Sequence, residues 1–97
     1  MNGRARAFAP IIERVGNPTP EQVRTAREQA GLTQTAAALL VSPARAQPYR
    51  TWQSYEVPSG QSGARSIPLA TWELFLLLTN QHPGLRLTRR RPAVTAP

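Results

Sequence analysis

Few residues of this sequence could take part in acid–base or metal chemistry. The chain has one histidine, no cysteine and no aspartate, so His82 and five glutamates are its main candidates. In the stretch "NQHPG" His82 stands where a chain ends a helix, and we expect a solvated turn residue there. No phosphate-binding glycine loop, paired-carboxylate motif or metal-ligand spacing accompanies it. We therefore expect a protein that is not an enzyme and that needs no cofactor or metal.

The charge balance points to an anionic partner. Twelve arginines stand against five glutamates, which gives a net charge of +7, and no lysine is present. Arginine offers planar, bidentate donors to phosphates and guanine edges, so double-stranded DNA is the first candidate. A GC-rich coding bias explains the ratio of arginine to lysine, but it does not explain the excess of positive charge.

The stretch "YRTWQSYE", residues 49–56, combines aromatic anchors with groups that can read bases. At helical spacing Trp52 and Tyr55 share one face, and we expect that face to pack on the core. Arg50 and Gln53, with Ser54 at the edge, then point outward. Arginine can bind guanine and glutamine can bind adenine through two hydrogen bonds each. The alternative is that these outward side chains are merely solvated.

The elements that position this stretch are predicted to be short helices. Thr19, Pro20 and Gln22 have the pattern of a capping box, and Gly31 fits the left-handed residue that ends the same helix. Within this helix Glu21 and Glu28 are spaced to form surface ion pairs with arginines 24 and 27.

A second helix is predicted to begin after Thr33, where small residues permit close packing. We expect its apolar face to comprise Leu32, Ala36, Leu39 and Leu40. The connection "VSPARAQP" should be irregular, with Pro48 opening the helix that contains residues 49–56 and Pro58 ending it.

The last predicted helix follows the polar loop at residues 59–65. Pro68 opens it, and apolar residues cover more than half of its circumference, which suggests burial on two sides. One side would be the protein's own core and the other a homodimer interface. We assign that interface to Trp72, Phe75, Leu76 and Leu78.

The expected fold is all-α, a helix-turn-helix domain of four to five short helices spanning residues 19–83. Residues 1–18 are an arm, a short helix from Ile11 to Val15, or a strand. Residues 84–97 form a basic, proline-containing tail, with a short strand at residues 85–88 and an arginine cluster at 89–91.

Three segments together resemble the Xre/Cro-like helix-turn-helix transcriptional regulators, especially small phage and plasmid versions, which include anti-CRISPR-associated regulators. These segments are "PEQVRTAREQAGLTQTAAALL", "RTWQSYE" and "PLATWELFLLL". The matching motif comprises Arg27, Gly31, Leu32, Thr33, Gln34, Ala37, Ala38, Tyr55 and Glu56. The resemblance implies that Gln34 touches a phosphate or a neighbouring base, and that Glu56 caps or pairs locally.

The connection before the second motif helix is longer than the usual turn in this family, which widens the set of candidate DNA contacts. The predicted DNA-binding residues are Gln34, Thr35, Arg45, Gln47, Tyr49, Arg50, Thr51, Gln53 and Ser54.

These observations favour a cytoplasmic, autoregulating repressor that binds an inverted repeat in double-stranded DNA as a homodimer. The alternative is a protein-interaction module, such as the antitoxin partner of a toxin, that uses the apolar last helix. RNA binding through the arginine tails is a third hypothesis. The longest apolar run, "LFLLL", is too short to span a membrane.

Overall fold

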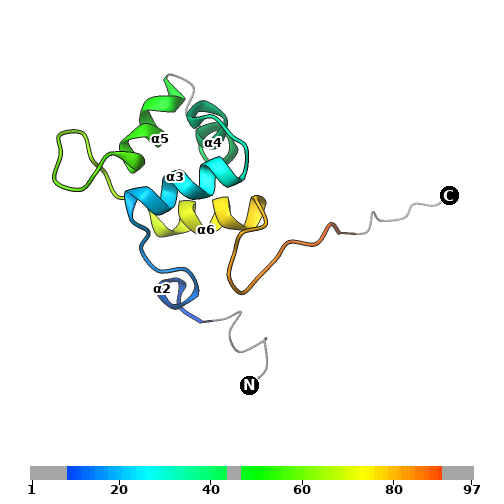
Figure 1. Cartoon of the computed structure of the whole chain (residues 1–97). Coiled ribbons are helices and arrows are strands. Elements are labelled where there is room, and N and C mark those ends of the chain that lie inside the picture. Colours follow the sequence, from blue (N-terminus) through cyan, green and yellow to red (C-terminus); the bar gives the residue numbers. More distant parts are fainter. Residues whose placement is uncertain (1–8, 44–46, 91–97) are drawn as a thin grey trace.

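The computed structural model describes residues 9–43 and 47–90, and these residues form α-helices without any β-strand. Helix α5 packs against α3 and α4, α6 packs against α4, and α2 packs against α6 (Figure 1). The all-α prediction is confirmed for this part of the chain. The helices are α2 (Ile11–Arg14), α3 (Pro20–Gln29), α4 (Gln34–Val41), α5 (Pro48–Glu56) and α6 (Leu69–Leu78).

The ends of α3 follow from local side-chain and backbone chemistry. Thr19 and Gln22 form the expected capping box, in which each side chain accepts a hydrogen bond from the other residue's backbone N–H. After the helix Gly31 has a φ of 73°, and the N–H groups of Gly31 and Leu32 donate to the carbonyls of Glu28 and Arg27. This is the Schellman arrangement, and both predicted helix limits are confirmed.

Helices α4 and α5 also begin as their sequences predict. The Thr33 hydroxyl accepts the backbone N–H of Ala36 at the start of α4. Pro48 is the first residue of α5, and Gln47 before it has a left-handed φ of 50°. Helix α5 ends at Glu56, two residues before Pro58.

The first described segment forms the short helix α2, which an ion pair holds against α6. Arg14 donates from Nε to Glu73 Oε2 at 2.6 Å and from Nη2 to Oε1 at 2.8 Å, and it also donates to the Ala9 carbonyl. The hydrogen bond from Arg14 lowers the pKa of Glu73 from 4.5 to about 2 against the opposing effect of burial, and His82 adds to the lowering. The short helix predicted from Ile11 to Val15 forms as Ile11–Arg14, and residues 1–8 of this predicted segment lie outside the described residues.

His82 is buried, contrary to the expectation of a solvated turn residue. Its side chain is 1% exposed, and its Nε2 lies 2.9 Å from Glu73 Oε2. Its Nδ1 accepts the backbone N–H groups of Gly84 and Leu85, both at 3.0 Å. The imidazole therefore connects α6 to the turn that follows it, because both of its nitrogens have partners within the fold.

The strand predicted at residues 85–88 is absent from the structure. Residues 85–90 have no regular secondary structure, and Leu87 is 56% exposed. A strand needs a neighbouring strand for its backbone hydrogen bonds, and none lies beside this segment in the described residues.

The core corrects the predicted dimer interface. Phe75 is fully buried against Trp52, with ring centroids 4.8 Å apart, and it stacks on Trp72 at 6.2 Å. Trp72 and Leu76 are 6% and 7% exposed within one protomer. Because these three α6 residues are already buried in the core, they cannot form a surface for a second copy. Of the four predicted interface residues, Leu78 alone is exposed.

The predicted apolar face of α4 is wrong for Leu39 and Leu40, whereas Leu32 before the helix packs against the core as predicted. Ala37 and Ala38 are buried, whereas Leu39 and Leu40 are 56% and 42% exposed. The small alanine side chains let α4 pack closely against its neighbouring helices, and this packing turns the two leucines outward.

Candidate nucleic-acid interface

Helix α5 has buried side chains and side chains that are open to solvent. Trp52 is fully buried and Glu56 is 5% exposed. Tyr49, Arg50 and Gln53 are exposed, and their spacings of three and four residues place them on one continuous helical face. The predicted outward orientation of Arg50 and Gln53 is confirmed, as is the burial of Trp52.

The other predicted contact residues differ in their accessibility. Thr35 and Gln47 are exposed, near the starts of α4 and α5 respectively. Thr51 and Ser54 are half-buried, and the Ser54 hydroxyl donates to the Thr51 carbonyl at 2.6 Å. Arg45 lies outside the described residues.

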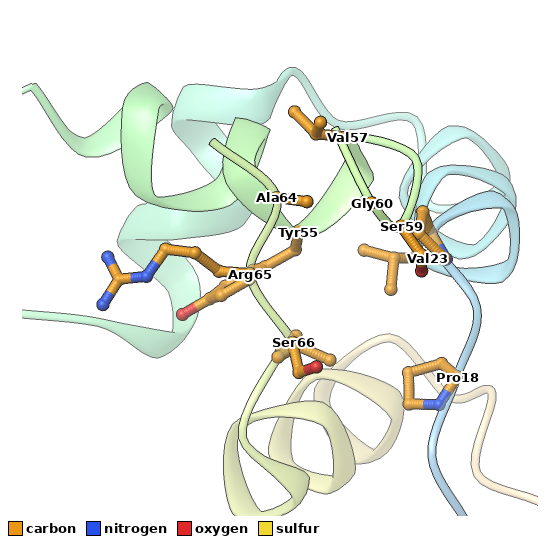
Figure 2. A pocket seen from close by; sticks show the side chains of 11 residues that line it. Pro18, Val23, Tyr55, Val57, Ser59, Gly60, Ala64, Arg65 and Ser66 are labelled. Carbon is orange, nitrogen blue, oxygen red and sulfur yellow. The ribbon is translucent and has the colours of Figure 1, made fainter. Parts of the chain in front are cut away.

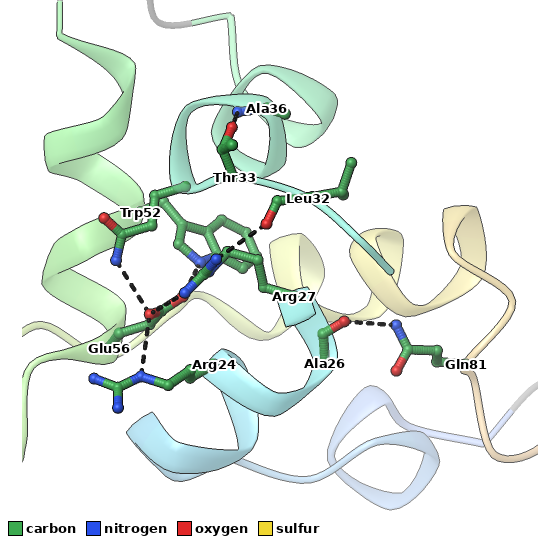
Figure 3. A network of polar contacts seen from close by, with 10 residues as sticks. Arg24, Ala26, Arg27, Leu32, Thr33, Ala36, Trp52, Glu56 and Gln81 are labelled. Atoms are coloured by element: carbon green, nitrogen blue, oxygen red, sulfur yellow. Dashed lines mark hydrogen bonds and ion pairs between the residues drawn. The ribbon is translucent and has the colours of Figure 1, made fainter. Parts of the chain in front are cut away.

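A buried carboxylate, that of Glu56, fixes the orientation of α5. Arg27 donates from Nε to Oε2 at 2.6 Å and from Nη2 to Oε1 at 3.1 Å. The Trp52 indole N–H donates to Oε2 at 2.6 Å, and the Gln34 amide donates to Oε1 at 3.1 Å (Figure 3). One carboxylate therefore joins α3, α4 and α5, and hydrogen bonds compensate for the loss of its hydration.

The partners of Glu56 keep it ionised. Burial by itself raises the pKa of its carboxyl group, but hydrogen bonds from Arg27, Trp52 and Gln34 together outweigh burial and lower that pKa below its ordinary value. The hydrogen bond between Arg27 and Glu56 also raises the pKa of the Arg27 guanidinium. The ion pair is thus intact at neutral pH, and it holds the outward face of α5 in one orientation.

The network changes two sequence-based assignments. Arg24 and Arg27 were expected to pair with Glu21 and Glu28, but both pair with Glu56, Arg24 at the longer distance of 3.6 Å. The Glu56 carboxylate is buried and accepts several hydrogen bonds, so it binds the Arg27 guanidinium more strongly than an exposed glutamate on α3 would.

Gln34 likewise takes part in this network. One of its amide N–H groups is committed to Glu56, so at least part of its role is structural. Its expected contact with a phosphate or base stays a prediction.

A further arginine, which sequence analysis assigned to a flexible loop, lies beside α5. The backbone N–H of Arg65 donates to the Ser54 carbonyl at 3.0 Å, which holds the end of the loop at residues 59–65 against α5. Figure 2 shows the Arg65 side chain extending away from the pocket that its backbone borders. This hydrogen bond places the Arg65 backbone beside α5, and nothing in the loop sequence predicts it.

The pocket beside this loop is small. It has a volume of about 200 Å³, and its lining includes Pro18, Val23, Tyr55, Ala64 and Ile67 but no histidine or carboxylate. Among the described residues no group of three or more histidine or acidic side chains could hold a metal ion.

The charges at the surface favour an anionic ligand at α5. Arg24, Arg50 and Arg65 are exposed on or beside this helix. Glu56 and Glu73 are buried in ion pairs with Arg27 and Arg14, so each mainly offsets the charge of its own partner, and Glu56 also lies 3.6 Å from Arg24.

The comparisons with known proteins assign no family. No protein-family model matches the chain, and no curated protein matches it. None of the helices in the described part of the chain is long and apolar enough to cross a membrane.

Proposed function

We propose that this protein is a sequence-specific regulator that binds double-stranded DNA, acting as an autoregulating repressor on an inverted repeat as a homodimer. The observation that carries the proposal is the outward face of α5, where Tyr49, Arg50 and Gln53 are exposed on a helix held in place by the buried Glu56 network. The proposed activity is binding, not catalysis.

The dimensions and chemistry of α5 suit the DNA major groove. That groove is about 12 Å wide and admits one α-helix, whose exposed side chains then meet the base edges. Arg50 can donate two hydrogen bonds to guanine, and Gln53 can pair with adenine through its amide.

Helix α4 would support α5 from the side of the phosphate backbone. Its first turn has no acidic residue, and Thr35 is exposed there. The start of a helix carries partial positive charge, so a DNA phosphate can approach it favourably. In this proposal α4 and α5 are the two helices of a helix-turn-helix of the Xre/Cro-like kind, and Arg65 contributes a phosphate contact from the loop.

The proposal is tested by fluorescence anisotropy with a duplex from the region upstream of the protein's own gene. A scrambled duplex of equal length is the control, and both are measured at two salt concentrations. Tight binding to the upstream duplex alone, weakening as salt increases, is the expected result.

Equal binding to both duplexes would mean that positive charge acts without base reading, and it would overturn sequence specificity. No binding to either duplex would favour the protein-interaction module instead.

A further inference from the structure

The segment after α6 is held to the helices through one ring nitrogen of His82. Nδ1 of this side chain, which is 1% exposed, accepts the backbone N–H groups of Gly84 and Leu85, each at 3.0 Å. In the described part of the chain these are the only hydrogen bonds between residues 84–90 and the rest of the fold. Beyond this turn the segment runs away from the helices (Figure 1). The polar contacts that place the segment therefore converge on a single acceptor atom.

The partners of the two ring nitrogens define the protonation state of the imidazole. A nitrogen that accepts two N–H groups carries no proton, so the single proton of the neutral ring lies on Nε2. Nε2 is 2.9 Å from Glu73 Oε2 and donates to it. The ring is thus an acceptor toward the turn at Gly84 and Leu85 and a donor toward α6.

Adding a proton to this ring would change its two sides differently. Nε2 would still donate to Glu73, and the positive charge would strengthen that hydrogen bond. Nδ1 would become a donor, so it would face the N–H groups of Gly84 and Leu85 as one donor against two others. The imidazole would stay on α6, while the turn would lose both of its hydrogen bonds.

The charges around the imidazole favour the same result. Glu73 on α6 pairs with both His82 and Arg14 of α2, so the three side chains together are neutral while the ring is neutral. Among the described residues no other charged side chain forms an ion pair or hydrogen bond with these three. A protonated ring would leave one positive charge uncompensated at a buried position, and opening of the turn would let water reach it.

We infer that His82 is a pH-dependent switch, in which the neutral ring holds residues 84–90 against the helices and protonation of Nδ1 releases them. The released segment carries Arg86, Arg89 and Arg90, so the switch controls where three positive charges lie. Histidine is the side chain whose charge ordinarily changes between about pH 5 and 8. This inference goes beyond the proposed function and does not depend on DNA binding.

The first test is an NMR titration of the full chain without DNA from about pH 8 to 5. This range isolates the switch, because His82 is the only histidine, no cysteine is present, and Glu73, with a pKa of about 2, stays ionised throughout. At the alkaline end the ¹⁵N signals of the ring should show an unprotonated Nδ1. As the ring protonates, the amide signals of Gly84 and Leu85 should shift with the same midpoint, and the heteronuclear NOE of residues 84–90 should fall. The amide signals of α3 and α5 should stay unchanged.

His82→Asn is the matched control. The side-chain carbonyl oxygen of asparagine lies near the position of Nδ1, so it can accept the same backbone N–H groups, but it does not titrate. Residues 84–90 of this variant should show no transition across the same range. A transition that persists in the variant would belong to a different group and would overturn the inference.

The wild-type protein also decides the matter by itself, so a misfolded variant does not leave the inference untested. Three results would each overturn it: a proton on Nδ1 at the alkaline end, a ring that stays neutral at the acid end, or a ring that protonates while Gly84 and Leu85 stay unchanged. None of these results bears on DNA binding, which the anisotropy experiment measures separately.

Discussion

At the scale of single residues, the contacts of Glu56 show which polar side chains stabilise the fold. Its carboxylate accepts hydrogen bonds from Arg27, Trp52 and Gln34 and pairs with Arg24 more loosely. Arg27 is therefore a structural residue, although a count of positive charges would include it among the DNA contacts. Arg50 and Gln53 are exposed on α5 and are the residues proposed to read bases.

Arg50→Ala and Gln53→Ala should each weaken specific DNA binding by about 1 to 3 kcal/mol, because each removes a side chain that can make two hydrogen bonds to a base. Anisotropy with the upstream duplex measures the loss, and thermal unfolding should be unchanged because both side chains are exposed. Gln29→Ala, at an exposed glutamine on α3, is the matched control. Wild-type binding by both α5 variants would show that another set of residues reads the DNA.

Glu56→Gln should lower the free energy of unfolding by about 3 kcal/mol, since it leaves the Arg27 guanidinium partly buried without its counter-charge. Urea denaturation measures this change. Glu28→Gln removes an exposed carboxylate and should change stability by less than about 0.5 kcal/mol. Equal effects of the two substitutions would mean that the buried network contributes little.

At the scale of elements, two contacts distant in sequence decide what the helices present. Arg14 and Glu73, 59 residues apart, hold α2 against α6. The hydrogen bond from Arg65 to Ser54 holds the loop against α5. The first contact fixes the position of a short helix, and the second fixes the position of a loop without regular secondary structure.

The Arg14–Glu73 ion pair should make stability depend on pH in the acid range. Folding lowers the pKa of Glu73 from 4.5 to about 2, so its contribution is fully present above the unfolded value and is lost as pH falls from 4.5 toward 2. The lowered pKa of Glu56 has an effect of the same sign. Melting temperatures measured across this range should fall, and Glu73→Gln should reduce that dependence. An identical pH profile for the variant would contradict the assignment.

Arg65→Ala should weaken binding to the upstream and the scrambled duplex by equal factors, because a phosphate contact does not depend on sequence. The slope of log affinity against log salt should become shallower by about 1. Arg86→Ala makes the same change in net charge on the segment after α6 and serves as the control. Equal losses for both variants would show that Arg65 acts through net charge alone.

At the scale of the whole molecule, charged and uncharged surfaces are separated. The arginines beside α5 offer a surface to an anion, while α4 and α6 expose leucines without charge. Positive charge at a surface attracts anions such as nucleic acids. The proposed function therefore predicts a dimer that binds a two-fold symmetric DNA site.

Such a dimer should require a fixed spacing between its half-sites. Two recognition helices in successive major grooves lie about 34 Å apart, which is one turn of DNA. Inserting about half a turn, roughly 5 base pairs, should abolish tight binding, whereas inserting a full turn should be less damaging because it restores the face of the duplex. Anisotropy with duplexes of altered spacing measures this. Binding that is insensitive to the insertion would argue for independent monomers.

The sequence by itself determined the helices, because their limits depend on contacts between residues three to five apart. The capping box at Thr19 and Gln22, the left-handed Gly31 and the prolines that begin and end α5 are all interactions of this range. The outward position of Arg50 and Gln53 followed from the same helical periodicity once Trp52 was placed in the core. DNA binding through that face remains a prediction.

Only the tertiary structure decided which sides of α4 and α6 are buried and which charges pair. Leu39 and Leu40 of α4 are exposed, while Ala37 and Ala38 are buried. Sequence periodicity predicts Trp72, Phe75 and Leu76 in a dimer contact, but these three residues fill the core. Glu56 takes its closest ion-pair partner from 29 residues away, and His82 is buried beside Glu73. These outcomes depend on the shapes of surfaces brought together from distant parts of the chain, which helical periodicity does not specify.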